Sequence, residues 1–255
     1  MVEMLMRRRN LFMAGGGIRP EPSDDGWELL ASYTISGTWS APWDGWFRLS
    51  CIGAGGTGGN GGEGVNNQRA PDDQKSVSGS GGGGGGSGGF SSSVLYLKKG
   101  DSLSYSYNGN ATLTVEIQGE NITMVATVGG IGNNGSKGNI RHAIEYDPPR
   151  WVVTVPNGGT GGTAGTASGG NKINSNGLLG GTGSRGTVGK KTTATNGGSG
   201  AYSAIPKFSN IPLNTGKGGD GGKGGYYDGK KQPPTNGLSG TVGGVFIEKE
   251  KGVTG

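Results

Sequence analysis

The chain has one cysteine, Cys51, and one histidine, His142, and these side chains are the best suited to nucleophilic or acid–base chemistry. Any Ser-His-Asp or Cys-His arrangement would have to use His142. It stands in "NIRHAIEYD", where a lone histidine beside a strand is typical of a structural or exposed residue. Cys51 lies in "GWFRLSCIG" with Phe47 and Leu49 on the same face of a predicted strand. We therefore expect a small buried hydrophobic residue at Cys51 and no catalytic cysteine.

The other sequence patterns that could carry chemistry are equally weak indications of an active site. The acidic pairs Asp72/Asp73 and Glu145/Asp147 lie in polar stretches, where solvated carboxylates are the usual interpretation. "GTVGKKTT" lacks the spacing of a phosphate-binding loop and the Ser or Thr that directly follows its Gly-Lys. One cysteine and one histidine also exclude a Cys/His zinc cluster. The sequence therefore predicts no enzyme, no catalytic residues, no cofactor and no metal site.

Two polar stretches are better suited to contacting another molecule. "GGYYDGKKQPPTNG", residues 224–237, places two tyrosines directly after a glycine repeat, and exposed tyrosines offer rigid contact area at low entropic cost. Lysine and glutamine add charge and polar reach, and two prolines stiffen the turn. The second stretch is "VNNQRAPDDQK", residues 65–75. The predicted contact residues are Tyr226, Tyr227, Asp228, Lys230, Lys231, Gln232, Asn67, Gln68 and Arg69. If both stretches are loop tips, they should lie near each other.

Alternating apolar residues predict the strands that must hold these stretches in place. The first run, "WELLASYTI", would put Trp27, Leu29, Ala31, Tyr33 and Ile35 on one face. "KKGDS" and "YNGN" are typical of tight turns between strands. The remaining strand-like runs are "GWFRLSCIG", "DSLSYSYNG", "TLTVEI", "ITMVATV", "RWVVTV" and "GVFIEKE". About eight short strands without a helical period predict an all-β fold built on a small β-sandwich.

Glycine fills the spaces between these strands. The 61 glycines and 11 prolines exceed a quarter of the 255 residues, which is typical of disordered chains. The apolar residues nevertheless cluster in strand-like runs, which favours an ordered frame with long insertions. The insertions cover about 54–89, 129–140, 157–200 and 214–243. A flexible linker is the alternative for each of them.

A three-residue rhythm within the insertions indicates a specific structure. Gly-Gly-X repeats begin at Gly55 and again at Gly218, and three residues per turn is the period of polyproline II. Such helices, packed side by side, could pair their N–H and C=O groups if glycine stands at every contact. One X per turn would then face outward. In "GSGGGGGGSGGF" we expect Ser80 and Ser87 to face a gap or solvent.

The domain organisation follows from these patterns. Residues 27–255 form the predicted glycine-rich β-sandwich domain, and residues 1–26 form a flexible or attachment segment. "MVEMLMRRRNLFMAGGG" contains an apolar patch too short for a signal peptide. No run approaches the roughly 18 apolar residues of a membrane span. The segment is therefore either a frayed terminus or a docking site for a partner.

Positive charge is concentrated in the glycine-rich half of the chain. The net charge is +5, and between residues 129 and 240 basic residues outnumber acidic ones by twelve to four. This distribution would steer encounters with an anionic partner, or it would simply keep a weakly hydrophobic surface soluble. The sequence has no Arg-Gly-Gly repeat, basic helix or aromatic–basic stripe, so nucleic acid is not an expected partner.

The order of these pieces resembles the glycine-rich adhesin domains of bacteriophage tail fibres and, more distantly, the separate adhesins at the tips of T-even-type long tail fibres. The pieces that carry the resemblance are "WFRLSCIGAGGTGGNGGEG", "GGGGGGSGGFSSSVLYLKKGDSLSYSYNG", "NITMVATVGGIGNNGSKGN" and "GLSGTVGGVFIEKE". Together they span roughly residues 27–250. The chain departs from the family pattern in its basic N-terminus and in the insertion that contains "KFSNIPLN".

The resemblance implies a β-sandwich base, a bundle of polyglycine II helices, and receptor-contacting loops at the far end. It implies a virion protein of the tail fibre or tail tip, with a host envelope glycan or outer-surface protein as receptor. The N-terminal region would attach to a phage tail-fibre or baseplate protein, and a homo-oligomer is left open. The alternatives are a structural glycine-rich capsid or tail decoration that binds no receptor, and an extracellular module of a cellular receptor. The lone cysteine and the missing signal peptide disfavour the last of these.

Overall fold

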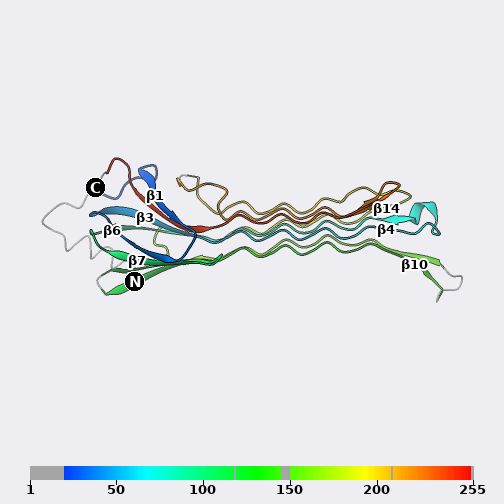
Figure 1. Cartoon of the computed structure of the whole chain (residues 1–255), viewed down its shortest axis with the longest axis horizontal. Coiled ribbons are helices and arrows are strands. Elements are labelled where there is room, and N and C mark those ends of the chain that lie inside the picture. The colour runs from blue at the N-terminus through cyan, green and yellow to red at the C-terminus, as the bar shows by residue number, and fades with distance from the viewer. Residues whose placement is uncertain (1–19, 118, 145–149, 208, 254–255) are drawn as a thin grey trace.

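The computed structural model describes residues 20–117, 119–144, 150–207 and 209–253. The molecule is elongated, with a two-sheet sandwich at one end, a shaft of glycine-rich segments, and short strands at the far end, here called the tip (Figure 1). Strands are the main regular secondary structure of the described chain, and the one short 3-10 helix found there is η1 (Asp72–Gln74). The predicted all-β fold is confirmed. Most of the predicted attachment segment, residues 1–19, lies outside the described residues.

Two five-stranded antiparallel sheets form the sandwich, with strand orders β1-β17-β3-β6-β13 and β12-β9-β8-β7-β2. The first sheet contains β1 (Trp27–Tyr33), β3 (Gly45–Ile52), β6 (Phe90–Leu97), β13 (Ile173–Ser175) and β17 (Gly244–Glu250). The second contains β2 (Gly37–Ser40), β7 (Ser102–Tyr107), β8 (Ala111–Ile117), β9 (Glu120–Ala126) and β12 (Ala167–Ser168). The first and last strands of the fold, β1 and β17, are direct partners.

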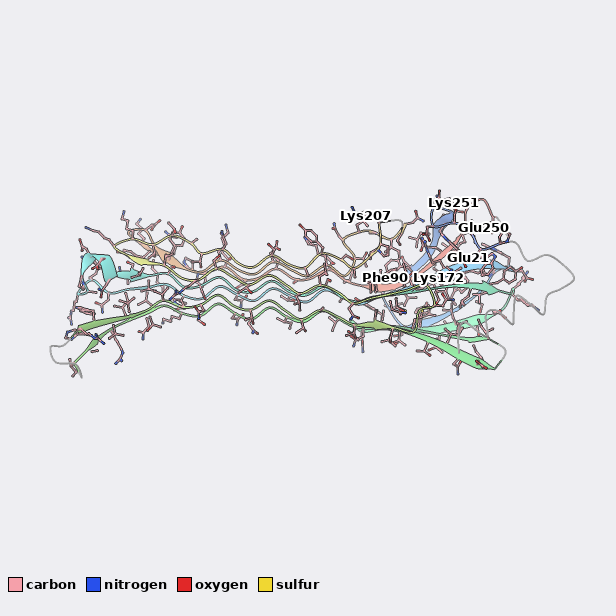
Figure 2. The ribbon with its side chains drawn as sticks, turned by 180° about the vertical axis from the view of Figure 1, so that it is seen from behind. Glu21, Phe90, Lys172, Lys207, Glu250 and Lys251 are labelled. Atoms are coloured by element: carbon pink, nitrogen blue, oxygen red, sulfur yellow. The ribbon has the colours of Figure 1, made fainter. Side chains whose placement is uncertain are left out.

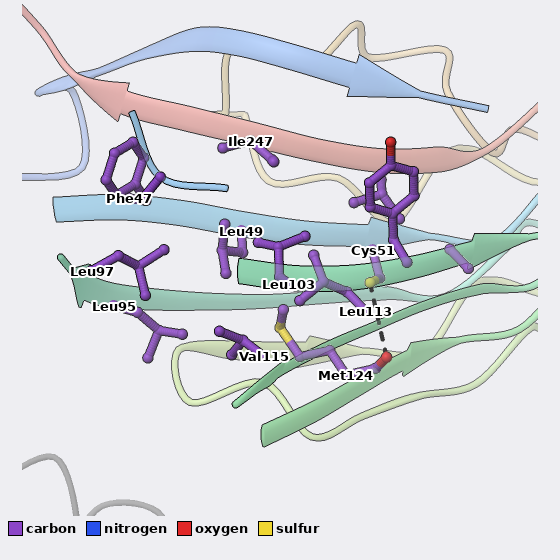
Figure 3. Close-up of a cluster of buried hydrophobic side chains, with 14 of the residues drawn as sticks. Phe47, Leu49, Cys51, Leu95, Leu97, Leu103, Leu113, Val115, Met124 and Ile247 are labelled. Atoms are coloured by element: carbon purple, nitrogen blue, oxygen red, sulfur yellow. Dashed lines mark hydrogen bonds between the residues drawn. The ribbon is translucent and has the colours of Figure 1, made fainter. Parts of the chain in front are cut away.

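Alternating side chains from both sheets fill the space between them (Figure 3). Leu49 and Cys51 of β3 are fully buried against Leu113 and Met124 of the opposite sheet's β8 and β9. The prediction that Cys51 is a buried hydrophobic residue is confirmed. Burial raises the pKa of its thiol far above the ordinary value, so the thiolate form is disfavoured.

Two predicted turns join neighbouring strands of the frame. Gly100, in "KKGDS", connects β6 to β7 with a φ of 89°, and Gly109, in "YNGN", connects β7 to β8 with a φ of 96°. Both values lie in the left-handed region that favours glycine. The turn residues therefore reverse the chain where the sequence predicted.

The predicted alternation fails in β1. The pairing of β1 with β17 shifts register between Leu29 and Ala31. This bulge separates Trp27, which is buried next to Arg48, from Ala31 and Tyr33, which pack on the main core. Ile35 lies beyond the strand and is exposed. One extra residue in a strand reverses the faces of the residues after it, so one uniform apolar face was the wrong expectation.

The outer face of the first sheet is covered by a strap, residues 203–207 and 209–214. Ile205 and Ile211 of the strap pack on Phe90 and Phe246. This segment contains the described part of "KFSNIPLN". Its position explains how a non-glycine insertion fits the fold, since it supplies a second, smaller core.

A buried ion pair lies beside the strap. Arg48 donates two hydrogen bonds of 2.6 Å to the carboxylate of Glu248, and both side chains are nearly or fully buried. Asn210 of the strap donates to the same carboxylate at 3.1 Å and to the carbonyl of Trp27 at 2.6 Å. The pair therefore ties the strap to β1, β3 and β17.

Eight glycine-rich segments form the shaft and run alternately from sandwich to tip and back (Figure 1). They comprise residues 53–64, 78–89, 127–138, 156–166, 176–187, 195–202, 215–225 and 233–243. The longer predicted insertions thus each contain two or three segments, separated by excursions at the tip or the base. Val128, assigned to a strand by its apolar character, lies on the shaft and is exposed.

Segment 78–89 is the centre of the shaft. Its amides donate in turn to three neighbours: Gly84 to Gly181, Gly85 to Gly219, and Gly86 to Gly130, at 2.8–2.9 Å. The same order of three accepting segments repeats every three residues along the segment. This is the three-residue turn predicted from the sequence. Its carbonyls accept from three further segments, 53–64, 156–166 and 195–202.

The six neighbours close a ring around this centre, because each also bonds to the next. In order the ring is 53–64, 127–138, 156–166, 176–187, 195–202 and 215–225, with the last bonded to the first. Segment 233–243 lies outside the ring and bonds to segments 53–64 and 215–225. The shaft is therefore held by backbone hydrogen bonds between segments.

Glycine is required by the closeness of these segments. A Cβ added at Gly83, Gly84 or Gly85 would lie well under 3.0 Å from a carbonyl oxygen of a different neighbour in each case. The ring segments have an open side, where X residues such as Thr57, Asn60 and Glu63 are exposed. Side chains accordingly stand along the outside of the shaft (Figure 2).

The expectation for Ser80 and Ser87 was wrong. Both are fully buried. The Ser80 hydroxyl accepts from the amide of Ser136 at 2.7 Å, and the Ser87 hydroxyl accepts from the amide of Leu178 at 2.8 Å. A serine hydroxyl can act as a hydrogen-bond acceptor, so it satisfies a neighbour's N–H within the packed bundle.

Candidate functional site

Four excursions between shaft segments make up the tip: residues 65–77, 139–154, 188–194 and 226–232, the second described without 145–149. They contain the short elements β4 (Val65–Asn66), η1, β5 (Ser76–Val77), β10 (Asn139–Ala143), β11 (Arg150–Thr154), β14 (Val188–Gly189), β15 (Tyr226–Tyr227) and β16 (Lys231–Gln232). Figure 1 shows these elements at the end opposite the sandwich. Residues far apart in sequence are thus brought to one end of the molecule.

Contacts between excursions join the tip into one unit. β5 pairs with β4 on one side and with β14 on the other, which links the first and third excursions. A small apolar cluster of Ala70, Val77 and Ile140 links the first to the second, with Trp151 packed against it. The tip therefore has a core of its own, separate from the core of the sandwich.

The fourth excursion forms a hairpin in which Tyr226 pairs with Gln232 and Tyr227 with Lys231. Both tyrosines are partly buried. The third excursion holds Tyr227 through Thr192, whose amide donates to the Tyr227 carbonyl at 2.7 Å. The predicted tyrosines are thus fixed by backbone contacts rather than carried on a free loop.

The charged residues of this hairpin are exposed around its turn. The Gln232 amide nitrogen lies 3.3 Å from a carboxylate oxygen of Asp228, and the Lys230 amide donates to that oxygen. These hydrogen bonds lower the pKa of Asp228. The ammonium of Lys231 lies 3.8 Å from Glu63, at the end of the first shaft segment.

The first excursion carries the remaining predicted residues. The Asn67 amide donates to Lys75 across the loop, and its side-chain oxygen accepts from the Arg69 amide at 3.1 Å. Gln68 reaches out of the loop, and its amide nitrogen lies 3.2 Å from the Tyr227 hydroxyl. The expectation that the two stretches meet is therefore confirmed.

An exposed ion pair also connects the first and third excursions. Asp72 accepts from Lys75 of its own excursion and lies 2.9 Å from the ammonium of Lys190. These two lysines hold the pKa of Asp72 at about 2. Exposed pairs contribute little stability, so the backbone pairing of β5 and β14 contributes more to this junction.

The hairpin of β10 and β11 is a tip element that the sequence analysis missed. "RWVVTV" was assigned to the sandwich, but β11 pairs with β10 in a separate two-stranded sheet at the far end. His142 is exposed as expected and stacks obliquely on Trp151, with ring centroids 5.0 Å apart. The sequence did contain an indication that this hairpin lies at the tip, because its strands stand between two glycine tracts that both lead there. Glu145 and Asp147 fall outside the described residues.

Among the described residues, no group of three or more His, Cys, Asp or Glu side chains is arranged to hold a metal ion. Within the same ranges, no helix has the length and apolar character needed to cross a membrane. The sequence matches no protein-family model and no curated protein.

Proposed function

We propose that this chain is a non-enzymatic phage virion adhesin of the tail fibre or tail tip, which recognises a host cell-surface receptor through its tip. The observation that carries the proposal is the meeting of four chain excursions at one end of a shaft whose segments are joined by backbone hydrogen bonds. Two of these excursions carry the predicted contact residues, and Gln68 touches Tyr227 between them.

Rigid display is the mechanism in this proposal. Each excursion begins and ends on a shaft segment that is hydrogen-bonded to its neighbours. Because the ends of each loop are fixed, little conformational entropy is lost when a receptor binds. Several copies on one virion would raise the overall avidity beyond that of a single weak contact.

The shaft also suits changes of receptor. Its packing depends on glycine backbones and not on the side chains of the tip. Substitutions in residues 226–232 would therefore alter the contact surface while the shaft hydrogen bonds persist. A host envelope glycan or an outer-surface protein is the partner expected for such a surface.

A cell-binding assay tests the proposal. Fluorescently labelled protein is incubated with a panel of bacterial strains, and binding is compared with that of the double variant Tyr226→Ala/Tyr227→Ala. The matched control is Leu178→Ala/Leu179→Ala, because these are also two consecutive large residues and are exposed on the shaft. A second tip variant, Lys230→Ala/Lys231→Ala, changes only exposed residues and checks that any loss is not due to misfolding.

We expect the wild type and the shaft control to bind at least one strain, and both tip variants to bind about tenfold or more weakly. If no strain binds the wild type, or if both tip variants bind as it does, the receptor-binding proposal is contradicted. A structural decoration protein would then be the better interpretation.

A further inference from the structure

One pocket lies where the shaft meets the tip. It has a volume of about 250 Å³ and is lined by Gly64, Val65, Asn66, Lys137, Tyr226, Tyr227 and Lys231. Gly64 and Lys137 lie at the ends of shaft segments 53–64 and 127–138, Gly64 runs directly into β4, which supplies Val65 and Asn66, and the other residues belong to the β15–β16 hairpin. The pocket therefore exists only when three separate parts of the chain are assembled.

Backbone contacts hold the walls of this pocket in position. The amide of Gly138 donates to Glu63 at 3.1 Å, and the amide of Gly225 donates to Gly62 at 2.8 Å. These bonds fix the segments that carry Lys137 and Tyr226. The pocket shape thus depends on shaft packing, which favours a preformed site.

The charges around the pocket favour an anion. Glu63 lies between two lysines, with its carboxylate 3.4 Å from the ammonium of Lys137 and 3.8 Å from that of Lys231. One carboxylate cannot neutralise two ammonium groups, so one positive charge remains. All three side chains are about half exposed or more, which leaves the ammonium groups reachable by a ligand.

The remaining lining residues favour a sugar ring. Tyr226 and Tyr227 offer aromatic surface on which the C–H face of a pyranose can pack, with hydroxyls for its polar edge. The Tyr227 hydroxyl is already positioned by Gln68 at 3.2 Å, and Gln68 donates to Asn66 at 2.6 Å. The volume lies below the range of about 300–1,000 Å³ that is usual for drug-sized ligands, which suits a single ring.

We infer that this pocket binds an anionic saccharide unit, a pyranose that carries a carboxylate or a phosphate ester. The ring packs on the tyrosines and the anion lies between Lys137 and Lys231, competing with Glu63 for them. This inference rests on the proposed function, since it names the ligand class for one part of the tip.

Amide chemical shifts of the full chain, followed by NMR during titration, test the inference. The probes are glucuronic acid, glucose 6-phosphate, neutral glucose, inorganic phosphate, acetate and a hexaglutamate peptide. We expect both acidic sugars to shift the amides of Asn66, Tyr226 and Tyr227 saturably, with dissociation constants in the millimolar range. Glucose, acetate and phosphate should bind about tenfold or more weakly, since each lacks the ring or the charge.

Charge variants sharpen this test. Lys137→Gln/Lys231→Gln should weaken both acidic sugars about tenfold or more while leaving weak glucose binding unchanged. The control Lys217→Gln/Lys223→Gln removes the same charge from segment 215–225, outside the pocket. It should bind like the wild type. An equal loss in the control would show long-range steering rather than a site, and would overturn the inference.

Three other results would also overturn it: glucose binding as tightly as the acidic sugars, phosphate or acetate alone giving the same midpoint, or hexaglutamate binding this site more tightly. The last result would assign an acidic peptide instead. If the protein binds cells but no acidic sugar shifts these amides, the pocket inference fails and the proposed function stands. If acidic sugars bind but no strain does, the adhesin proposal fails and the pocket stands.

Discussion

The sandwich and the shaft are held together by opposite means. In the sandwich, buried side chains such as Leu49, Leu113 and Met124 fill the space between two sheets. In the shaft, the central segment 78–89 has almost no side chains, and its amides and carbonyls pair with six neighbours. Apolar burial stabilises the first region, and close backbone approach stabilises the second. Adding side-chain volume should therefore damage the centre of the shaft, and removing it should damage the sandwich.

The largest expected effect comes from adding a side chain at the centre of the shaft. In Gly84→Val, the new Cβ would lie well under 3.0 Å from the carbonyl oxygen of Ser199, and neither backbone can move without breaking its own hydrogen bonds. We expect destabilisation of about 3 kcal/mol or more, at the upper end of overpacking effects. Thermal unfolding measures it. Thr57→Val, on an exposed position, is the control and should change stability by about 0.5 kcal/mol or less.

The reverse substitution should damage the sandwich. Leu113→Ala removes a fully buried side chain from the core and leaves a cavity. We expect a loss of about 2–5 kcal/mol in the free energy of unfolding, measured with urea. Leu179→Ala, an exposed position on the shaft, should be nearly neutral. Similar stabilities for the two variants would contradict the assignment of the core to Leu113.

A smaller effect is expected at a serine inside the shaft. Ser87→Ala removes the hydroxyl that accepts from the Leu178 amide and leaves that amide without its partner. The cost of an unmade buried hydrogen bond is about 1–3 kcal/mol. Unfolding in urea would report it. If Ser87→Ala left the free energy of unfolding unchanged, the hydroxyl would be dispensable, and a small side chain would be the only requirement at this position.

Much of the sandwich could be predicted from the sequence. Alternation in β3, β7 and β8 identified the residues that pack between the two sheets, and the turns at Gly100 and Gly109 were marked by their residue types. The bulge in β1 was not predictable from alternation, because it depends on the pairing of β1 with β17. Ser87 was misjudged because its environment is set by a neighbour, Leu178, that is distant in sequence.

The tip was predicted only in part. The glycine repeats before residues 65–75 and 224–237 indicated that both stretches stand at the end of the shaft, and they do meet. The β10–β11 hairpin was missed because its apolar alternation is the same as that of a sandwich strand. Periodicity reports which face is apolar, but the position of a strand along the molecule depends on how the glycine segments are ordered.

The smallest expected effect concerns the exposed ion pairs of Asp72 with Lys75 and Lys190 at the tip. The two lysines depress the pKa of Asp72 to about 2, from an ordinary value of about 3.9. A depressed carboxyl pKa stabilises the folded state above the ordinary value, and this contribution is lost as pH falls towards 2. An NMR titration of the Asp72 carboxyl should therefore show a low midpoint, and Lys75→Gln/Lys190→Gln should return it towards 3.9. An unchanged midpoint in that variant would contradict the contact between the excursions.

Hydrogen exchange of the central segment tests the account most directly. Each amide from Gly79 to Gly89 donates to a carbonyl of a neighbouring segment, and the segment is fully buried. These amides should exchange with solvent at least as slowly as those of the sandwich core, although the segment has no secondary structure of the usual kinds. Exchange at the rate of an unstructured glycine peptide would contradict the packed shaft, and with it the fixed tip on which the proposed recognition depends.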